Sequence, residues 1–246
     1  MTVLATENLV VKRGGATLID NLTLSLGPTG SVAIIGPNGA GKSTLLRTLV
    51  GIEAPTSGRV LIGGRDLSSL SGIARAQAIG YVPQHFDPHW DLNVSELVRL
   101  GAERTGKIAD GVIEKALAEY ELTALHHRRW STLSGGERAR ALLAMVLSVD
   151  PPVLLADEPA ASLDIRHRLD VVRALAARGR DRLSVVVMHD LDLAFRFFEE
   201  VILLDRGQVA LRSSASEVAA DQRLDCVFGV TFDRYTTEFG PVLHAR

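Results

Sequence analysis

A glycine-rich loop followed by lysine and serine is the first group of residues that could do chemistry. Gly36-Pro37-Asn38-Gly39-Ala40-Gly41-Lys42-Ser43-Thr44 follows the apolar run Val32 to Ile35 and opens a segment with helical spacing. Glycines let backbone N–H groups wrap phosphates, and the positive end of the helix dipole favours anions. Lys42 would reach the β- and γ-phosphates, and the Ser43 hydroxyl would bind Mg²⁺. The loop and its strand–helix context predict a nucleotide-binding site.

Two adjacent carboxylates end another apolar run. Asp157 and Glu158 follow Val153 to Ala156, which is typical of a strand buried on both faces. Ligands collect at the carboxyl ends of parallel strands, so we expect both acids near the bound phosphates. Asp157 would orient Mg²⁺, and Glu158 would act as general base toward the attacking water. A solvated strand end is the alternative interpretation of a lone acid.

Three separate polar residues could complete this site. Gln84 follows a β-prone segment and could offer its amide oxygen to Mg²⁺ and the water, and His189 follows the run Val185 to Met188. An imidazole can donate a hydrogen bond to the γ-phosphate without being a strong base. Asp164 lies just beyond the carboxylate pair. Taken singly, each is more typical of a surface or capping residue, and only their order favours a catalytic role.

A short motif opens the helical segment that ends near Ser148. Leu133-Ser134-Gly135-Gly136-Glu137 contains the spacing of a capping box, in which Ser134 caps the amide of Glu137 and the Glu137 carboxylate returns to the Ser134 N–H. A capped helix start keeps free N–H groups and a positive dipole end, which can receive a phosphate. The motif therefore predicts both a helix start and an anion site.

Periodicity places these motifs on alternating strands and helices. Strands are predicted at 3–11, 22–26, 31–35, 58–63, 153–156, 183–188 and 201–204, and helices at 42–50, 94–100, 111–121, 137–148, 165–177 and 191–198. This order predicts an α/β fold with a mainly parallel sheet and a helical insertion in the middle. The last forty residues are the least readable part of the sequence.

Composition narrows the class of protein. The chain has 246 residues, 46% hydrophobic content and a net charge of −2, so it is globular with no electrostatic sign of a nucleic-acid partner. The single cysteine, Cys226, excludes an internal disulfide and is expected to be a small buried side chain. Apolar runs are too short for a membrane span, and the N-terminus lacks a basic signal region. We expect a soluble protein, or one held at a membrane by a partner.

The order of the motifs resembles the ATP-binding subunit of ATP-binding cassette (ABC) transporters. The family's Walker A matches residues 36–44, its Q-loop Gln84, its signature 133–137, its Walker B 153–158, its D-loop Ala161-Ser162-Leu163-Asp164 and its switch histidine His189. The resemblance implies one ABC ATPase domain with a P-loop NTPase core. An antiparallel N-terminal β-subdomain and the core would occupy 1–84 and 151–205, a helical signature subdomain about 85–150, and a C-terminal segment 206–246.

The resemblance also implies partners. A second identical subunit would form a head-to-tail dimer, in which ATP and Mg²⁺ lie between one phosphate loop and the other subunit's Ser134, Gly135, Gly136 and Glu137. Glu158, with Gln84, Asp164 and His189, would hydrolyse the ATP. The dimer would drive a transmembrane permease, and indirectly a solute-binding protein, from the cytoplasmic face of the inner membrane. No nucleic acid is implied.

Finer similarity points to the importers of iron-siderophores, haem and vitamin B12, through Gln84-His85, His89-Trp90, the glutamate of the signature and Val227-Phe228-Gly229-Val230. The alternatives are an importer of zinc, manganese or another small solute, and a soluble cassette ATPase without a transport role. The family usually stacks an aromatic on adenine, and here Arg13 takes that place. A solvated turn arginine is the competing interpretation. Trp90 is either a permease anchor or a buried side chain.

Overall fold

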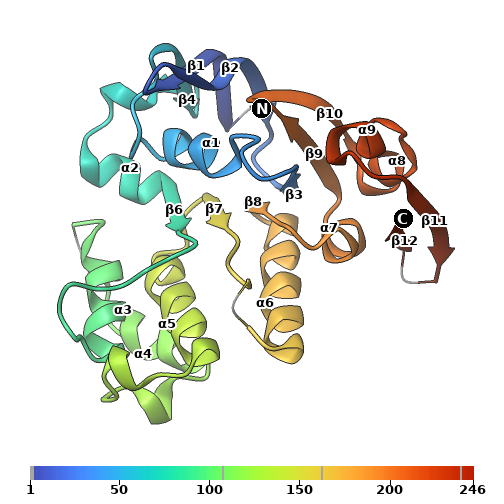
Figure 1. Ribbon diagram of the computed structural model, residues 1–246. Helices are drawn as coiled ribbons and strands as arrows, with labels where there is room; N and C mark the ends of the chain where they lie inside the picture. The colour runs from blue at the N-terminus through green and yellow to red at the C-terminus, as the bar shows by residue number, and fades with distance from the viewer. Residues whose placement is uncertain (1–2, 107, 162, 239) are drawn as a thin grey trace.

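A six-stranded sheet forms the centre of the molecule (Figure 1). The computed structural model describes residues 3–106, 108–161, 163–238 and 240–246. The strand order is β10-β9-β3-β8-β7-β6, with bounds β10 (Gln208–Ser214), β9 (Glu200–Asp205), β3 (Gly30–Ile35), β8 (Leu183–Val187), β7 (Val153–Asp157) and β6 (Ile79–Val82). All neighbours pair in parallel except β10 with β9. The predicted mainly parallel sheet is confirmed.

An antiparallel sheet is built from the N-terminal third of the chain. Its order is β2-β1-β4-β5, with bounds β2 (Ala16–Leu26), β1 (Leu4–Arg13), β4 (Ser57–Ile62) and β5 (Arg65–Asp66). Helix α1 (Lys42–Leu49) lies between this sheet and the central sheet (Figure 1). One apolar cluster joins Leu9 of β1 to Leu45 of α1 and Ile34 of β3. This packing fixes the helix that begins at the phosphate loop.

The middle of the chain forms a helical body with its own core. It contains α3 (Val94–Glu103), α4 (Val112–Glu119) and α5 (Gly135–Leu147), and α2 (Gly72–Ala78) precedes it. Leu97, Leu117 and Trp130 pack in one cluster with Ala141 of α5. The three predicted helices are present. The stretch from Tyr120 to Ser134 holds only two single turns of 3₁₀-helix, so the helix predicted at 111–121 ends earlier, at Glu119.

Two helices cover the other face of the central sheet. These are α6 (Ile165–Ala177) and α7 (Leu191–Phe197), and both pack in the largest apolar cluster. Leu142 and Val146 of α5 enter the same cluster, against Leu154 of β7. Helix α5 therefore contributes to two cores and ties the helical body to the sheet.

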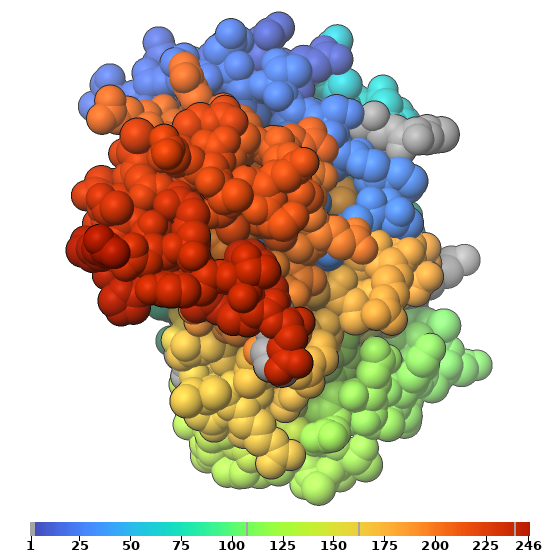
Figure 2. Space-filling model, turned by 90° about the vertical axis from the view of Figure 1, so that its right-hand side faces the viewer, coloured from blue at the N-terminus to red at the C-terminus, as the bar shows by residue number. Residues whose placement is uncertain are grey.

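The C-terminal residues, which gave no sequence pattern, are ordered into further elements. Strand β10 extends the central sheet beyond residue 205, and it is followed by α8 (Ala215–Ala220), α9 (Arg223–Phe228) and the hairpin β11 (Phe232–Thr237) with β12 (Gly240–Ala245). Figure 2 shows them as one red body between the blue N-terminal part and the yellow residues of α6. Leu243 of β12 donates its N–H to Asp192 of α7 at 3.2 Å. The hairpin therefore packs on the helix that follows His189.

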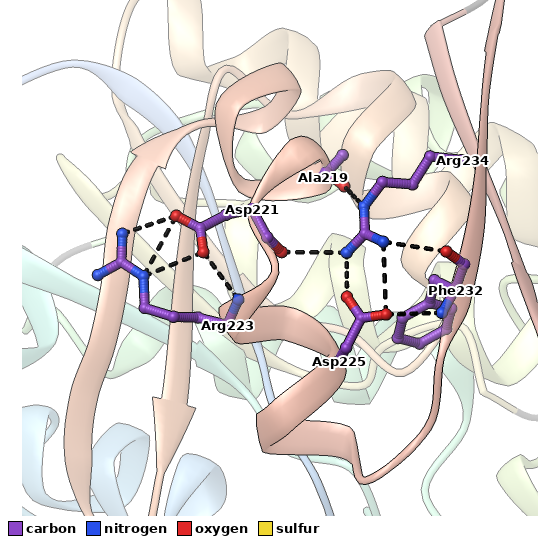
Figure 3. A network of polar contacts seen from close by, with 6 residues as sticks. All are labelled: Ala219, Asp221, Arg223, Asp225, Phe232 and Arg234. Carbon is purple, nitrogen blue, oxygen red and sulfur yellow. Dashed lines mark hydrogen bonds and ion pairs between the residues drawn. The ribbon is translucent and has the colours of Figure 1, made fainter.

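An arginine holds this C-terminal body together (Figure 3). The Arg234 guanidinium forms an ion pair with Asp225 and donates to the backbone carbonyls of Ala219, Asp221 and Phe232. Nearby, Arg223 pairs with the Asp221 carboxylate at 2.7 Å and lowers the pKa of Asp221 to about 2. Arg234 thus links α8, α9 and β11 with one side chain.

Two expectations from composition have different outcomes. Cys226 is exposed on α9, so the expectation that it is buried is wrong. Among the residues that the structure describes, no helix is both long enough and apolar enough to cross a membrane.

Candidate functional site

The phosphate loop lies between the end of β3 and the start of α1, as predicted. Gly36 and Gly41 have φ angles of 149° and 100°. A Cβ atom would approach the Leu204 carbonyl oxygen to 2.2 Å at Gly36 and the Leu18 carbonyl oxygen to 2.5 Å at Gly41. These two positions require glycine because both the backbone angle and the close neighbour exclude a side chain. Asn38 and Gly39 form the exposed tip of the loop, and Ala40 is buried beneath it.

Backbone carbonyl groups of the phosphate loop hold the Lys42 side chain in place. Its Nζ atom donates to the carbonyl oxygens of Gly36 at 2.7 Å and Pro37 at 3.0 Å. The side chain is buried, and burial lowers its pKa, with Glu158 and Asp157 acting in the opposite direction. Ser43 and Thr44 follow in the first turn of α1. The loop thus places the Lys42 ammonium group close to the loop backbone at the N-terminus of α1.

Asp157 connects the carboxylate pair to the phosphate loop. Its Oδ1 atom accepts a hydrogen bond from Ser43 Oγ at 3.1 Å. Its Oδ2 atom is buried and has no hydrogen-bond partner among the described residues. Burial raises the pKa of Asp157, and the neighbouring Glu158 raises it further. A buried carboxylate oxygen without a partner beside a serine hydroxyl is the donor set that suits Mg²⁺.

Glu158 is the point where three strand ends meet. Gln84, two residues after β6, donates its Nε2–H to Glu158 Oε2 at 2.7 Å. His189, two residues after β8, places Nε2 at 2.5 Å from Glu158 Oε1. Glu158 itself follows β7 and has a left-handed backbone with φ 49°, which is costly for a side chain other than glycine. The structure therefore brings together Gln84, Glu158 and His189, of which the first and the last are more than a hundred positions apart in the sequence.

The predicted capping box is present at the start of α5. The Ser134 N–H donates to Glu137 Oε2 at 2.7 Å, and the Glu137 N–H donates to Ser134 Oγ at 3.3 Å. Gly135 and Gly136 occupy the first turn, where helical N–H groups have no acceptor within the helix. A cavity of about 500 Å³ borders Gly135 and also Gln84 and Glu158. The capped helix start thus faces a hollow shared with the catalytic candidates.

Asp164 is a helix-capping residue, which is one of the two roles that the sequence allows for it. It is the N-cap of α6, accepting from the His167 N–H at 3.0 Å, and its side chain is 67% exposed. The His167 ring lies against Gly136, where an added Cβ would be 3.4 Å away. Ser162, which the sequence assigns to the same loop, lies outside the described residues. The cap orients the loop that leads from Glu158 to α6.

Arg13 and Trp90 were each given two interpretations. The Arg13 Nη2 atom pairs with Glu53 Oε2 at 2.6 Å, and the arginine side chain is 58% exposed at the end of β1. Trp90 is 72% exposed, so burial inside the chain is excluded. An exposed tryptophan in the loop between Gln84 and α3 remains available to a partner.

Sequence reasoning missed several contacts around the signature motif. Arg128 contacts Glu137, and Arg129 contacts the Asp91 carbonyl oxygen. The Asp91 carboxylate accepts from both the N–H and the hydroxyl of Ser131 at 2.9 Å. No spacing rule relates residues that are 40 positions apart. A charged pair flanking a motif that already holds an acid was the one available signal.

Two ATP-binding proteins of importers are similar to this chain over most of its length. The chain is 41% identical to a hemin import ATP-binding protein, HmuV, of Rhodopseudomonas palustris strain HaA2, over 88% of this chain and 87% of that protein. It is also 41% identical to a cobalamin import ATP-binding protein, BtuD, of Halobacterium salinarum strain ATCC 29341 / DSM 671 / R1, over 82% of this chain and 52% of that protein.

A solved dimeric ATP-binding cassette in a post-hydrolysis state, bound to ADP and Pi, superposes with a TM-score of 0.78 at 28% identity. The alignment covers 86% of this chain and 98% of that one. The family described as ABC transporter matches residues 19–161, which is more than half of the sequence. Because the fold, the phosphate loop and the order of the motifs agree with these matches, the chain belongs to the ABC transporter family.

Proposed function

We propose that this chain is the ATP-hydrolysing subunit of an importer for haem or a related metal chelate. The observation that carries the ATPase part is the convergence of Gln84 and His189 on Glu158, at the sheet edge that also holds Asp157, Ser43 and the phosphate loop. The import part rests on the similarity to hemin and cobalamin import ATP-binding proteins.

Glu158 is the general base of the proposed reaction. Two side chains, Gln84 and His189, fix the orientation of its carboxylate. The carboxylate takes the proton of the water that attacks the γ-phosphate. Lys42 and the loop amides of residues 36–44 bind the β- and γ-phosphates, and His189 donates to the γ-phosphate. Arg13 stacks on the adenine with the face of its guanidinium.

Mg²⁺ is the proposed metal of the site. Asp157 with its unpartnered Oδ2 atom, Ser43 with its hydroxyl and Gln84 with its amide oxygen would hold it. When bound, the ion neutralises charge on the β- and γ-phosphates.

The signature segment serves a nucleotide held by a second copy of the chain. Ser134, Gly135, Gly136 and Glu137 present a helix N-terminus, and the phosphate loop presents the other half of the site. A head-to-tail dimer brings the two halves together twice, and Asp164 sets the loop that faces the second copy. The solved relative that is dimeric and bound to ADP and Pi supports this arrangement.

A permease is the proposed membrane partner, contacted through the exposed Trp90. The complex would include a solute-binding protein and act at the cytoplasmic face of the inner membrane. The sequence alternatives, an importer of zinc or manganese and a soluble cassette ATPase, have no observation in their favour that haem import lacks.

Replacing Glu158 by glutamine tests the catalytic assignment. We expect Glu158→Gln to bind ATP within about threefold of wild type and to hydrolyse it at least about a hundredfold more slowly, because the amide cannot accept the proton of the water. With ATP present, the variant should accumulate as a dimer in size-exclusion chromatography. Rapid turnover by this variant would exclude Glu158 as the base.

Uptake by cells that lack the gene tests the import assignment. Cells would be given labelled haemin, cobalamin or an iron-siderophore, and complemented with wild-type chain or with Glu158→Gln. Loss of haemin uptake alone, restored only by the active chain, supports the proposal. Loss of cobalamin or siderophore uptake would move the substrate within the same class, and normal uptake of all three would contradict it.

A further inference from the structure

Residues 133–137, which are proposed to bind the phosphates of ATP, contain an acidic side chain. Glu137 lies in the first turn of α5, beside the N–H groups of Gly135 and Gly136. A carboxylate there helps to cap the helix, but it also repels a phosphate that approaches the same helix end. The capping bond satisfies only one of its oxygens, Oε2. The charge on Glu137 therefore needs a counterion if the segment is to attract the nucleotide.

Arg128 supplies that counterion. Its Nη1 atom donates to Glu137 Oε1 at 3.1 Å, the oxygen that the cap leaves available. Its Nη2 atom donates to the Thr132 carbonyl oxygen at 2.8 Å. The Glu137 side chain is 19% exposed and that of Arg128 is 45% exposed, so water screens the charges of this pair in part. Contacts with the Ser134 N–H and with Arg128 lower the pKa of Glu137, the former more strongly.

The backbone of Arg128 is held by hydrogen bonds to residues outside 133–137. Its carbonyl oxygen accepts from the Val94 N–H at 3.1 Å, in the first turn of α3, and its own N–H donates to Leu125 at 2.8 Å. The neighbouring Arg129 forms an isolated bridge with Asn93, the N-cap of α3. The guanidinium is therefore delivered from a fixed segment to a fixed helix start.

We propose that Arg128 is a positioning residue of the ATPase reaction, which neutralises Glu137 so that the α5 N-terminus attracts the γ-phosphate of the nucleotide held by the second copy. This inference rests on the proposed function of residues 133–137. It assigns Arg128 a role only because residue 137 is a glutamate. With glutamine at that position the cap would persist and the counterion would become dispensable.

A double-mutant cycle tests this dependence. Arg128→Ala should lower the ATPase rate by about tenfold, while Glu137→Gln should lower it by about twofold, because an amide caps the helix less strongly than a carboxylate. In the double variant, Arg128→Ala should cause no further loss, so that the rate equals that of Glu137→Gln alone and stays well above that of Arg128→Ala. Arg128→Lys, which keeps the charge but not the second hydrogen bond, should retain most of the activity.

Two further measurements separate positioning from folding. ATP binding to the isolated subunit should be unchanged in Arg128→Ala, because the segment acts on the other copy's nucleotide. ATP-dependent dimer formation, measured in the Glu158→Gln background, should fall. Arg59→Ala is the matched control, since it removes an ion pair with Glu7 of 2.6 Å on the N-terminal sheet, and it should leave both readouts unchanged.

The outcomes that contradict the proposal are distinct. A double variant as impaired as Arg128→Ala would mean that Arg128 acts through Thr132 or touches phosphate itself. If Arg128→Ala melts at a much lower temperature, Arg128→Lys decides: an inactive but folded lysine variant also overturns the counterion role. If Gly135→Asp leaves the ATPase rate of the dimer at the wild-type level, residues 133–137 serve no nucleotide, and the proposed function itself fails.

Discussion

Asp157 combines full burial with a carboxylate oxygen that has no partner among the described residues. Burial raises its pKa above the ordinary value of 3.8. The folded chain thus binds this proton more readily than the unfolded chain, so the free energy of unfolding falls as pH rises from 3.8 toward the raised pKa. Above that pKa the carboxylate is charged in the folded chain, and its burial lowers the free energy of unfolding by the full amount. The residue is maintained at the expense of stability.

Replacing this aspartate should therefore stabilise the chain without nucleotide. Asp157→Asn should raise the free energy of unfolding by about 1 kcal/mol, and the melting temperature by about 2–4 °C, because a buried amide costs less than a buried unpaired carboxylate. The gain should widen as pH rises above about 4 in thermal denaturation, while ATPase activity is lost. Asp110→Asn, at an exposed acid, is the control. A lower melting temperature for Asp157→Asn would contradict this account.

Helices α5 and α8 offer a comparison at the scale of elements, because both begin with the same serine–glutamate capping box. Ser134 pairs with Glu137 at the start of α5, and Ser214 pairs with Glu217 at the start of α8. The two caps have the same local structure. They differ in what lies beyond the helix end, since α5 borders the cavity that reaches Glu158 and α8 belongs to the C-terminal body.

Removing each hydroxyl separates capping from function. Ser134→Ala and Ser214→Ala should each destabilise the chain by about 1 kcal/mol, because each leaves an N-terminal amide without its acceptor. Only Ser134→Ala should also lower the ATPase rate, on the order of tenfold, because in the proposed dimer its hydroxyl also contacts the nucleotide of the second copy. Thermal melting and steady-state ATPase assays check both. Equal ATPase rates in the two variants would reduce the signature serine to a cap.

Sequence patterns predict the features that depend on contacts between neighbouring residues. The glycine loop before α1, the acids after β7 and the Ser134–Glu137 box were all predictable, because each depends on neighbouring residues or on a single strand end. The bonds of Arg128 with Glu137 and of Asp91 with Ser131 join segments whose proximity depends on how α3, α5 and their loops pack. The C-terminal elements carried no periodicity, since α8 and α9 have six residues each.

At the scale of the whole molecule, the C-terminal body depends on the partly buried side chain of Arg234. Arg234 bonds to three backbone carbonyls and one carboxylate, whereas Arg223 bonds mainly to the neighbouring Asp221 (Figure 3). Arg234→Met should lower the melting temperature and expose residues 215–246 to protease, because three carbonyls lose a donor. Arg223→Met should change neither appreciably, since an exposed pair contributes little. Equal protease sensitivity of the two variants would exclude the linking role of Arg234.

The proposed contact with a permease can be tested at an exposed aromatic side chain. Trp90 is 72% exposed in the loop before α3, and Tyr235 is 57% exposed on the C-terminal hairpin. If Trp90 anchors the permease, Trp90→Ala should weaken the complex by about 2 kcal/mol, roughly thirtyfold in affinity, without changing the melting temperature. Tyr235→Ala is the aromatic control. Copurification of the permease with Trp90→Ala at the wild-type yield would contradict the anchor.

The exposed Cys226 has a practical consequence. It is the only cysteine in the sequence, and it lies on α9 in the C-terminal body. A maleimide fluorophore or a nitroxide spin label would therefore attach once per subunit without any engineering of the chain. In a two-copy assembly this gives a single inter-label distance. Opening and closing of the two copies during ATP turnover would then be followed directly, as a change in that one distance.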